Sequence, residues 1–114
     1  MNINKFTQKS IEAVNNCEKI AYDYGNQEID QEHLLKSLID QEDGLILKLI
    51  EKMEINTAHF SNRVTEYLNK KVKVQGGDLR ISNDLNKVLI TAEDEAKAMG
   101  DEYVSVEHLF LSLL

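Results

Sequence analysis

A segment that occurs twice constrains this chain more than any other feature of its sequence. Residues 28–39 recur as residues 103–114, so that the Glu-His pair ending at His33 returns in the pair ending at His108, 75 positions later (108 − 33). One structural unit is therefore encoded twice. The same offset aligns five pairs upstream, which are Phe6 with Ile81, Thr7 with Ser82, Glu18 with Glu93, Ala21 with Ala96 and Gly25 with Gly100.

Each copy of the repeated segment starts in the way that a helix starts. Asp30 and Ser105 are N-cap candidates, because their side chains can accept from an early backbone N–H, and the glutamate that follows is favoured by the helix dipole. His33 and His108 then fall at the third helical position. We expect both imidazoles to hydrogen-bond within the cap or to pack between helices.

Helical periodicity of apolar residues predicts four helices in the first copy. The first runs from a cap at Thr7 to Gly25, where a left-handed glycine would close it. The second begins after Asp30, the third covers about 44–53, and the fourth follows a cap at Asn56.

The second copy contains counterparts of only the first two of these helices. Ser82 caps one that ends at Gly100, and the last begins after Ser105. We therefore predict an all-α domain over residues 1–114, made of two pseudo-repeats of a four-helix unit, the second truncated after two helices. Repeat 1 covers about 6–70, a linker containing Gly76-Gly77 covers 71–81, and partial repeat 2 covers 82–114.

The counterparts of the third and fourth helices would fall near 119–128 and 132–145, beyond Leu114. We expect the chain to be a fragment, cut or proteolysed, whose last helix leaves an apolar patch. Such a patch favours self-association through the C-terminal helix, or else that helix frays as unsupported termini do.

The composition limits which partners the chain can bind and where in the cell we expect it. Its 114 residues are 42% hydrophobic and 29% charged, as in a globular domain, and the net charge of −7 repels nucleic acid and anionic membranes. Apolar runs are far shorter than the roughly 20 residues that span a bilayer, and no signal peptide opens the chain, so we expect a cytoplasmic protein. A single Cys17 excludes an internal disulfide and suits a small core position.

Catalytic and metal-binding motifs have characteristic residue types and spacings. The chain has no phosphate-binding loop, no H-E-x-x-H pair, no nucleophile elbow and no second cysteine, so we expect no catalysis and no cofactor in this chain. A metal-dependent protein built on the doubled Glu-His is the enzymatic alternative. Its spacing is unfavourable, because adjacent helical residues point about 100° apart whereas ligands sharing a metal sit three or four apart.

Glu32 and Glu107, the glutamates of the two Glu-His pairs, have two possible roles. A glutamate in the first helical turn stabilises the helix, yet two equivalent carboxylates at helix starts can also receive cationic groups from a partner. We treat them as a possible twin carboxylate site, and their exposure decides between the two roles. His59 has no counterpart in the repeat and is expected at the surface.

Three segments resemble the Clp amino-terminal repeat domain, and the resemblance covers the whole chain. They are the twin Gly-(Asn/Asp)-x-x-(Ile/Val)-x-x-Glu-His-Leu units, the opening Phe6-Thr7-Gln8-Lys9-Ser10, and the stretch Gly76-Gly77-Asp78-Leu79-Arg80-Ile81-Ser82. Within that family the chain is most similar to the disaggregase branch.

The resemblance implies a module that engages unfolded or aggregated polypeptides. In the parent protein it is joined flexibly to two AAA+ ATPase modules, which bind ATP and Mg, form a hexamer that threads polypeptide through a pore, and work with the DnaK chaperone system. The implied client-binding positions are Thr7, Asp101 and Glu107, with an apolar groove to which Leu89 and Phe110 contribute.

Two alternative functions stay open at this point. In a degradative branch of the same family, carboxylates matching Glu32 and Glu107 receive phosphorylated arginine, which implies an adaptor-docking or phosphoarginine-docking domain. The linker resembles the disaggregase branch more. A free-standing adaptor is the other alternative.

Overall fold

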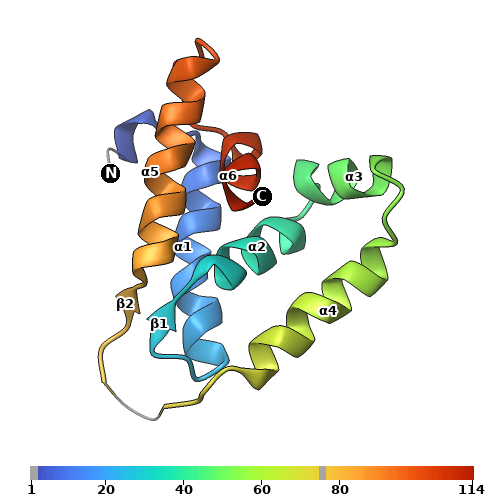
Figure 1. Cartoon of the computed structure of the whole chain (residues 1–114), viewed down its shortest axis with the longest axis vertical. Coiled ribbons are helices and arrows are strands. Elements are labelled where there is room, and N and C mark those ends of the chain that lie inside the picture. The colour runs from blue at the N-terminus through green and yellow to red at the C-terminus, as the bar shows by residue number, and fades with distance from the viewer. Residues whose placement is uncertain (1–2, 75–76) are drawn as a thin grey trace.

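The computed structural model describes residues 3–74 and 77–114, so Gly76 of the expected linker lies outside the described residues. Within that part of the chain the structure is mostly helical, with one short parallel pair of strands (Figure 1). The predicted all-α class is confirmed. The elements are η1 (Ile3–Lys5), α1 (Gln8–Asp23), β1 (Glu28–Ile29), α2 (Gln31–Asp40), α3 (Leu45–Lys52), α4 (Thr57–Lys70), β2 (Arg80–Ile81), α5 (Asn83–Ala98) and α6 (Val106–Leu113).

The long helices α1 and α5 start and stop with equivalent residues. Thr7 Oγ1 accepts from the Ser10 N–H at 3.2 Å, and Ser82 Oγ accepts from the Leu85 N–H at 3.0 Å. At the other end Gly25 and Gly100 have φ angles of 70° and 74°, a left-handed conformation that a Cβ disfavours. The predicted caps and helix ends are therefore confirmed.

The core is built from the inner faces of all six described helices. α1 packs mainly against α2, and α5 packs mainly against α6. Small residues of α1, Ala13 and Cys17, allow close approach, and large aliphatic side chains fill the space between the helices. The largest fully buried apolar side chains are Leu34, Leu38, Ile46, Ile50, Leu68, Leu85, Leu89 and Leu109.

The backbone contacts between the repeats are reciprocal. Ile29 of β1 pairs with Ile81 of β2, and Phe6 forms an isolated parallel bridge with Val104. Since Phe6 and Ile81 are equivalent positions, as are Ile29 and Val104, each repeat gives the other the same strand contact. The sequence did not indicate these strands, and β2 lies inside the expected linker.

The segment after α4 lies against the first repeat. The Val74 N–H donates to the Gly25 carbonyl at 2.8 Å, and the Asn26 side-chain amide donates to the Val72 carbonyl at 3.3 Å. Lys73 Nζ adds a bond of 2.7 Å to the Tyr24 carbonyl. Residues 71–74 are thereby fixed along the turn between α1 and β1.

None of the helices in the described residues combines the length and the apolar character that crossing a bilayer requires.

Candidate functional site

An apolar groove lies between the two repeats, with a volume of about 200 Å³. It takes residues from η1, α1, α2, α5 and the paired strands. Leu85 and Leu89 are almost fully buried and form its floor, whereas Ile3 and Ile81 are 42% and 49% exposed and form its edge. This inter-repeat groove is lined by Ile3, Val14, Asn15, Cys17, Glu18, Ile29, Leu34, Ile81, Leu85 and Leu89.

The residues expected to bind a client are not all in this groove. Leu89 lines it, but Phe110 is a buried residue of α6 that does not. Of the residues the sequence did not point to, Ile3 and Ile81 are the apolar groups that the groove presents to solvent. Neither residue belongs to an α-helical pattern of apolar residues, because Ile3 lies in the short 3-10 helix η1 and Ile81 lies in strand β2.

Cys17 contributes a thiol to the groove lining. It is 2% exposed, burial raises its pKa to about 12, and its Sγ–H donates to the Ala13 carbonyl. A neutral buried thiol is a poor nucleophile. Cys17 therefore acts here as a small apolar residue, as the sequence predicted.

Thr7 and Asp101 lie near Val104, at the other contact between the repeats. The Thr7 N–H donates to the Val104 carbonyl at 3.0 Å, and its hydroxyl is the N-cap of α1. Asp101 lines a separate polar hollow of about 520 Å³ together with Lys5, Lys97 and Glu102. Its side chain is 49% exposed, and its Oδ2 is bonded to His108 Nε2.

The two repeat histidines lock the starts of α2 and α6. Asp30 and Ser105 donate their N–H groups to Nδ1 of His33 and His108, at 2.8 and 2.9 Å. The proton is then on Nε2, which points to Asn26 Oδ1 at 2.9 Å in the first repeat and, in the second, to the Asp101 oxygen already described, at 2.8 Å. The predicted role of these imidazoles within the caps is confirmed.

Both ring nitrogens of each histidine are thus occupied by protein groups. Across residues 3–74 and 77–114, no cluster of three or more His, Cys, Asp or Glu side chains is placed to hold a metal ion. Burial, together with the nearby charge of Lys71, lowers the pKa of His33 to about 4. His33 is accordingly neutral at physiological pH.

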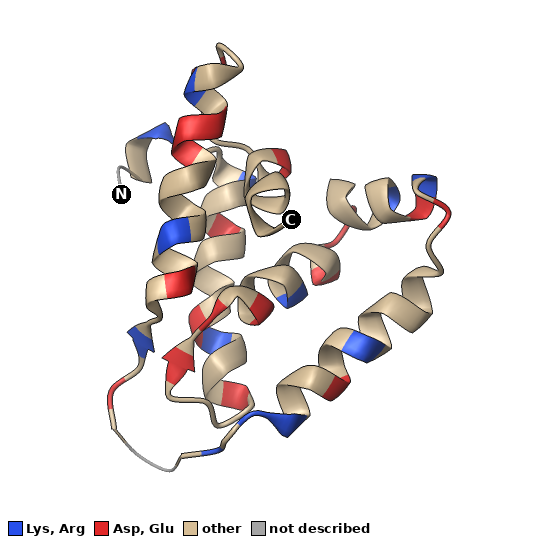
Figure 2. Cartoon of the chain, in the orientation of Figure 1, with Lys and Arg blue, Asp and Glu red and all other residues tan. Residues whose placement is uncertain are grey.

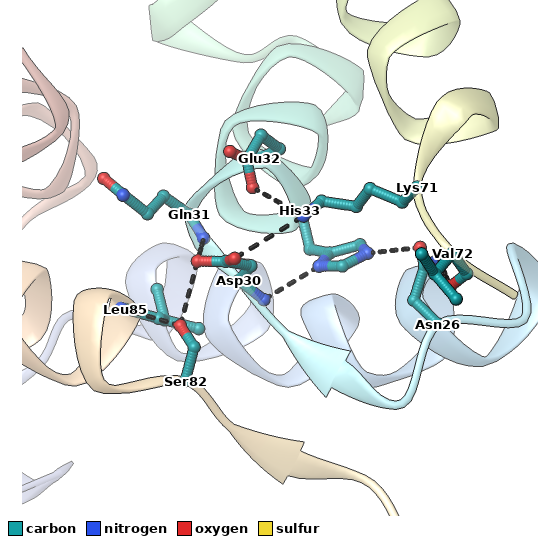
Figure 3. Close-up of polar contacts among 9 residues, drawn as sticks. All are labelled: Asn26, Asp30, Gln31, Glu32, His33, Lys71, Val72, Ser82 and Leu85. Carbon is teal, nitrogen blue, oxygen red and sulfur yellow. Dashed lines mark hydrogen bonds and ion pairs between the residues drawn. The ribbon is translucent and has the colours of Figure 1, made fainter. Parts of the chain in front are cut away.

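The twin carboxylates differ in their surroundings. Glu107 is exposed in the first turn of α6, whereas Glu32 is partly buried. Glu32 Oε2 lies 3.5 Å from Lys71 Nζ, and so does Asp30 Oδ2 (Figure 3). Lys71 is the first residue after α4, and nothing in the sequence pattern singled it out as more than a favourable C-terminal charge.

Asp30 connects this cluster to the second repeat. Its Oδ1 accepts from the Gln31 N–H at 2.8 Å and from the Ser82 hydroxyl at 2.9 Å (Figure 3). Burial alone would raise the pKa of Asp30, but these two donors and the Lys71 ammonium outweigh burial and lower it. For Lys71, burial would lower the pKa, and the carboxylates of Glu32 and Asp30 outweigh it and raise the pKa.

Charge is unevenly spread over the molecule. Figure 2 shows acidic residues along α1, α2 and α5, while basic residues gather at the end of α4 and just after it. A second groove, of about 650 Å³, lies between α2 and α4 near this basic region. This α2–α4 groove is lined by Glu32, Leu35, Phe60, Arg63, Val64, Glu66, Tyr67 and Lys70.

Two interlocked helical repeats, with an apolar groove between them, define the class of domain. The family described as "Clp repeat (R) N-terminal domain" matches residues 5–114. The chain belongs to this family, which confirms the resemblance seen in the sequence.

This chain has curated relatives that are chaperone proteins named ClpB. It is 41% identical over 119 residues to the chaperone protein ClpB of Nitratidesulfovibrio vulgaris and 40% identical over 114 residues to that of Porphyromonas gingivalis. All of this chain is covered in both cases, but only 14% and 13% of the relatives. The chain therefore spans a small part of the length of the curated relatives it matches.

Solved structures agree on the fold. The Hsp104 N-terminal domain from Candida albicans superposes with a TM-score of 0.86 at 25% identity, over 96% of this chain and 73% of that one. The N-terminal domain of ClpV1 from the E. coli EAEC Sci1 T6SS gives 0.87 at 19% identity, over 97% and 68%. A further structure, described as a peptide from the SciI protein of that system, gives 0.87 at 19%, over 97% and 71%.

Proposed function

We propose that this chain is the client-binding module of a ClpB-type chaperone, and that it engages unfolded or aggregated polypeptides through the inter-repeat groove. The observation that carries the proposal is the groove itself, whose floor is aliphatic and whose edge residues, Ile3 and Ile81, are about half exposed. Apolar side chains are what unfolded polypeptides expose and folded ones hide.

The size of the groove limits the affinity. Burying one or two large apolar side chains contributes about 1.5–3 kcal/mol each, before the cost of association and of ordering the client is subtracted. Binding is therefore weak and broad in sequence preference. The interaction is mainly apolar, and a chain with a net charge of −7 gains little long-range attraction to acidic clients. Raising the salt concentration therefore leaves the affinity nearly unchanged.

The remaining expected residues have two different roles in this proposal. Thr7 and Phe110 support the domain from inside, since Thr7 caps α1 and Phe110 is buried. Asp101 and Glu107 are exposed and are available to basic side chains of a client. Leu89 acts as the groove floor.

The proposal extends to the parent protein. The AAA+ modules that we expect beside this domain bind ATP and Mg, form the hexamer, and cooperate with the DnaK chaperone system in the cytoplasm. The domain itself catalyses nothing and needs no cofactor. Its contribution is to hold a client before threading.

NMR shift mapping with a reduced and alkylated, permanently unfolded protein tests the proposal. We expect shifts at groove residues, and we expect Ile81→Ser to weaken binding severalfold. Ile90→Ser is the matched control, because Ile90 is 47% exposed but does not line the groove. Absence of shifts at millimolar concentration, equal effects of both variants, or a steep loss of affinity with salt would contradict the proposal.

Docking of an adaptor or of phosphoarginine, as in the ClpC branch, is the second candidate, and the exposed Glu107 favours it. Shifts confined to the first turn of α6 on addition of free phosphoarginine would support this candidate.

A further inference from the structure

The two repeat carboxylates differ although their positions in the repeat are equivalent. Glu107 is exposed, and the residue two positions before it is Ser105. Glu32 is partly buried, and the residue two positions before it is the acidic Asp30. The first repeat thus brings two carboxylates to one place where the second repeat has one.

Lys71 fills the space between these two carboxylates. Its Nζ lies 3.5 Å from Glu32 Oε2 and 3.5 Å from Asp30 Oδ2 (Figure 3). It also lies 5.7 Å from the centre of the Tyr67 ring. Glu32 Oε2 is buried and accepts no hydrogen bond from the described residues. The ammonium of Lys71 is therefore the group that balances this buried oxygen.

The backbone holds Lys71 at this place. Its own N–H donates to the Leu68 carbonyl at 3.2 Å at the end of α4, and the next carbonyl, that of Val72, accepts from the Asn26 side chain. A ligand tethered in this way has an effective concentration in the millimolar range or above. A free cation of similar chemistry must displace it in order to reach Glu32.

We propose that Lys71 is an internal ligand of Glu32, which closes the first-repeat carboxylate to cationic side chains of a partner and leaves Glu107 as the accessible one. Lys71 is thus a specificity-determining residue of the twin carboxylate site. The carboxylates raise its pKa, so the ammonium stays charged under physiological conditions. This inference goes beyond client binding, since it concerns neither the inter-repeat groove nor an apolar ligand.

Arginine methyl ester, a guanidinium without a free carboxylate, is a suitable probe in an NMR titration at low ionic strength. In Lys71→Met, we expect the amide signals of Glu32 and His33 to shift on addition of the ester. The apparent Kd for the ester should be at least tenfold lower than in the wild type. Lys73→Met is the matched control, because Lys73 Nζ bonds to the Tyr24 carbonyl rather than to a carboxylate. It should behave as the wild type does.

A second variant and a double variant complete the test. Lys71→Gln should open the site as Lys71→Met does, and it serves if the methionine variant does not fold. Lys71→Met with Glu32→Gln should lose the response again. The proposal would be overturned if the apparent Kd for the ester differed by less than tenfold between Lys71→Met and the wild type. It would also be overturned if the ester shifted the amide signals of neither protein.

Discussion

Phe6 pairs with Val104 through the backbone, although 98 positions separate them (104 − 6). The equivalent positions Ile81 and Ile29 pair in the same way. The hydrogen bonds repeat as well: the N–H groups of Thr7 and Ser82 donate to the Val104 and Ile29 carbonyls, at 3.0 and 2.9 Å. Neither repeat can therefore open at one of these contacts without losing a partner that belongs to the other repeat.

This interlocking predicts that the two repeats unfold together. In native-state hydrogen exchange, the amides of Thr7 and Ser82 should exchange with the same free energy as the amides in the core of α1 and α5, since both require global unfolding. Ile29→Ala should cost about 2–5 kcal/mol and should lower the protection of both amides equally. Loss of protection at Ser82 alone would show that the repeats open independently.

The glycines that end α1 and α5 give a second prediction. Gly25→Ala and Gly100→Ala should each destabilise the domain by about 1 kcal/mol or more, because both glycines have positive φ angles. A Cβ on Gly100 would meet nothing within 4 Å, so the whole cost there is backbone strain. Gly100→Asn is the control, since Asn tolerates this conformation. Equal thermal midpoints for Gly100→Ala and the wild type would contradict the explanation.

Ser82 should be the most costly helix cap to remove. Its hydroxyl accepts from the Leu85 N–H and also donates to Asp30, so Ser82→Ala removes both bonds and leaves the buried Leu85 N–H without its acceptor. We expect a loss of about 2 kcal/mol, the upper part of the usual range for a cap. Asn56→Ala removes an exposed cap of α4 and should cost about 1 kcal/mol. Chemical denaturation of both variants would measure the difference, and equal losses would refute it.

The helices were predictable because their signals are local. Thr7, Ser82, Gly25 and Gly100 mark helix ends by their own side chains or by the lack of one. The 75-residue offset was equally clear from the repeated residues, and it correctly placed His33 and His108 in equivalent caps.

The strand contacts and the carboxylate cluster were not predictable in this way. β1 and β2 are two residues each, too short to show an alternating pattern, and their pairing depends on how the repeats pack. Lys71 reaches Asp30 and Glu32 only because α4 ends beside α2. The groove edge, formed by Ile3 and Ile81, depends on the same packing. Leu89 is therefore the one groove-lining residue that the sequence resemblance named as a client-binding position.

The buried His33 predicts how stability depends on pH. Unfolded histidine has a pKa of about 6.5, and burial with the charge of Lys71 lowers that of folded His33 to about 4. Between these values the unfolded chain binds a proton that the folded chain does not. The stabilisation is thus fully present above pH 6.5 and is lost as the pH falls toward 4, by up to about 1.4 kcal/mol per unit.

Urea denaturation at intervals between pH 7 and 4.5 would measure this loss, in a window above the one in which Asp30 begins to titrate. Asp30 contributes in the same direction only below about pH 3.9, because its folded pKa is lowered. His33→Gln should flatten the dependence, and His59→Gln, at an exposed position, is the control variant. An NMR titration of the His33 ring supplies an independent measurement. A midpoint near 6.5, or equal slopes in all three proteins, would show that the folded imidazole accepts a proton freely and that burial and the charge of Lys71 do not hold it neutral.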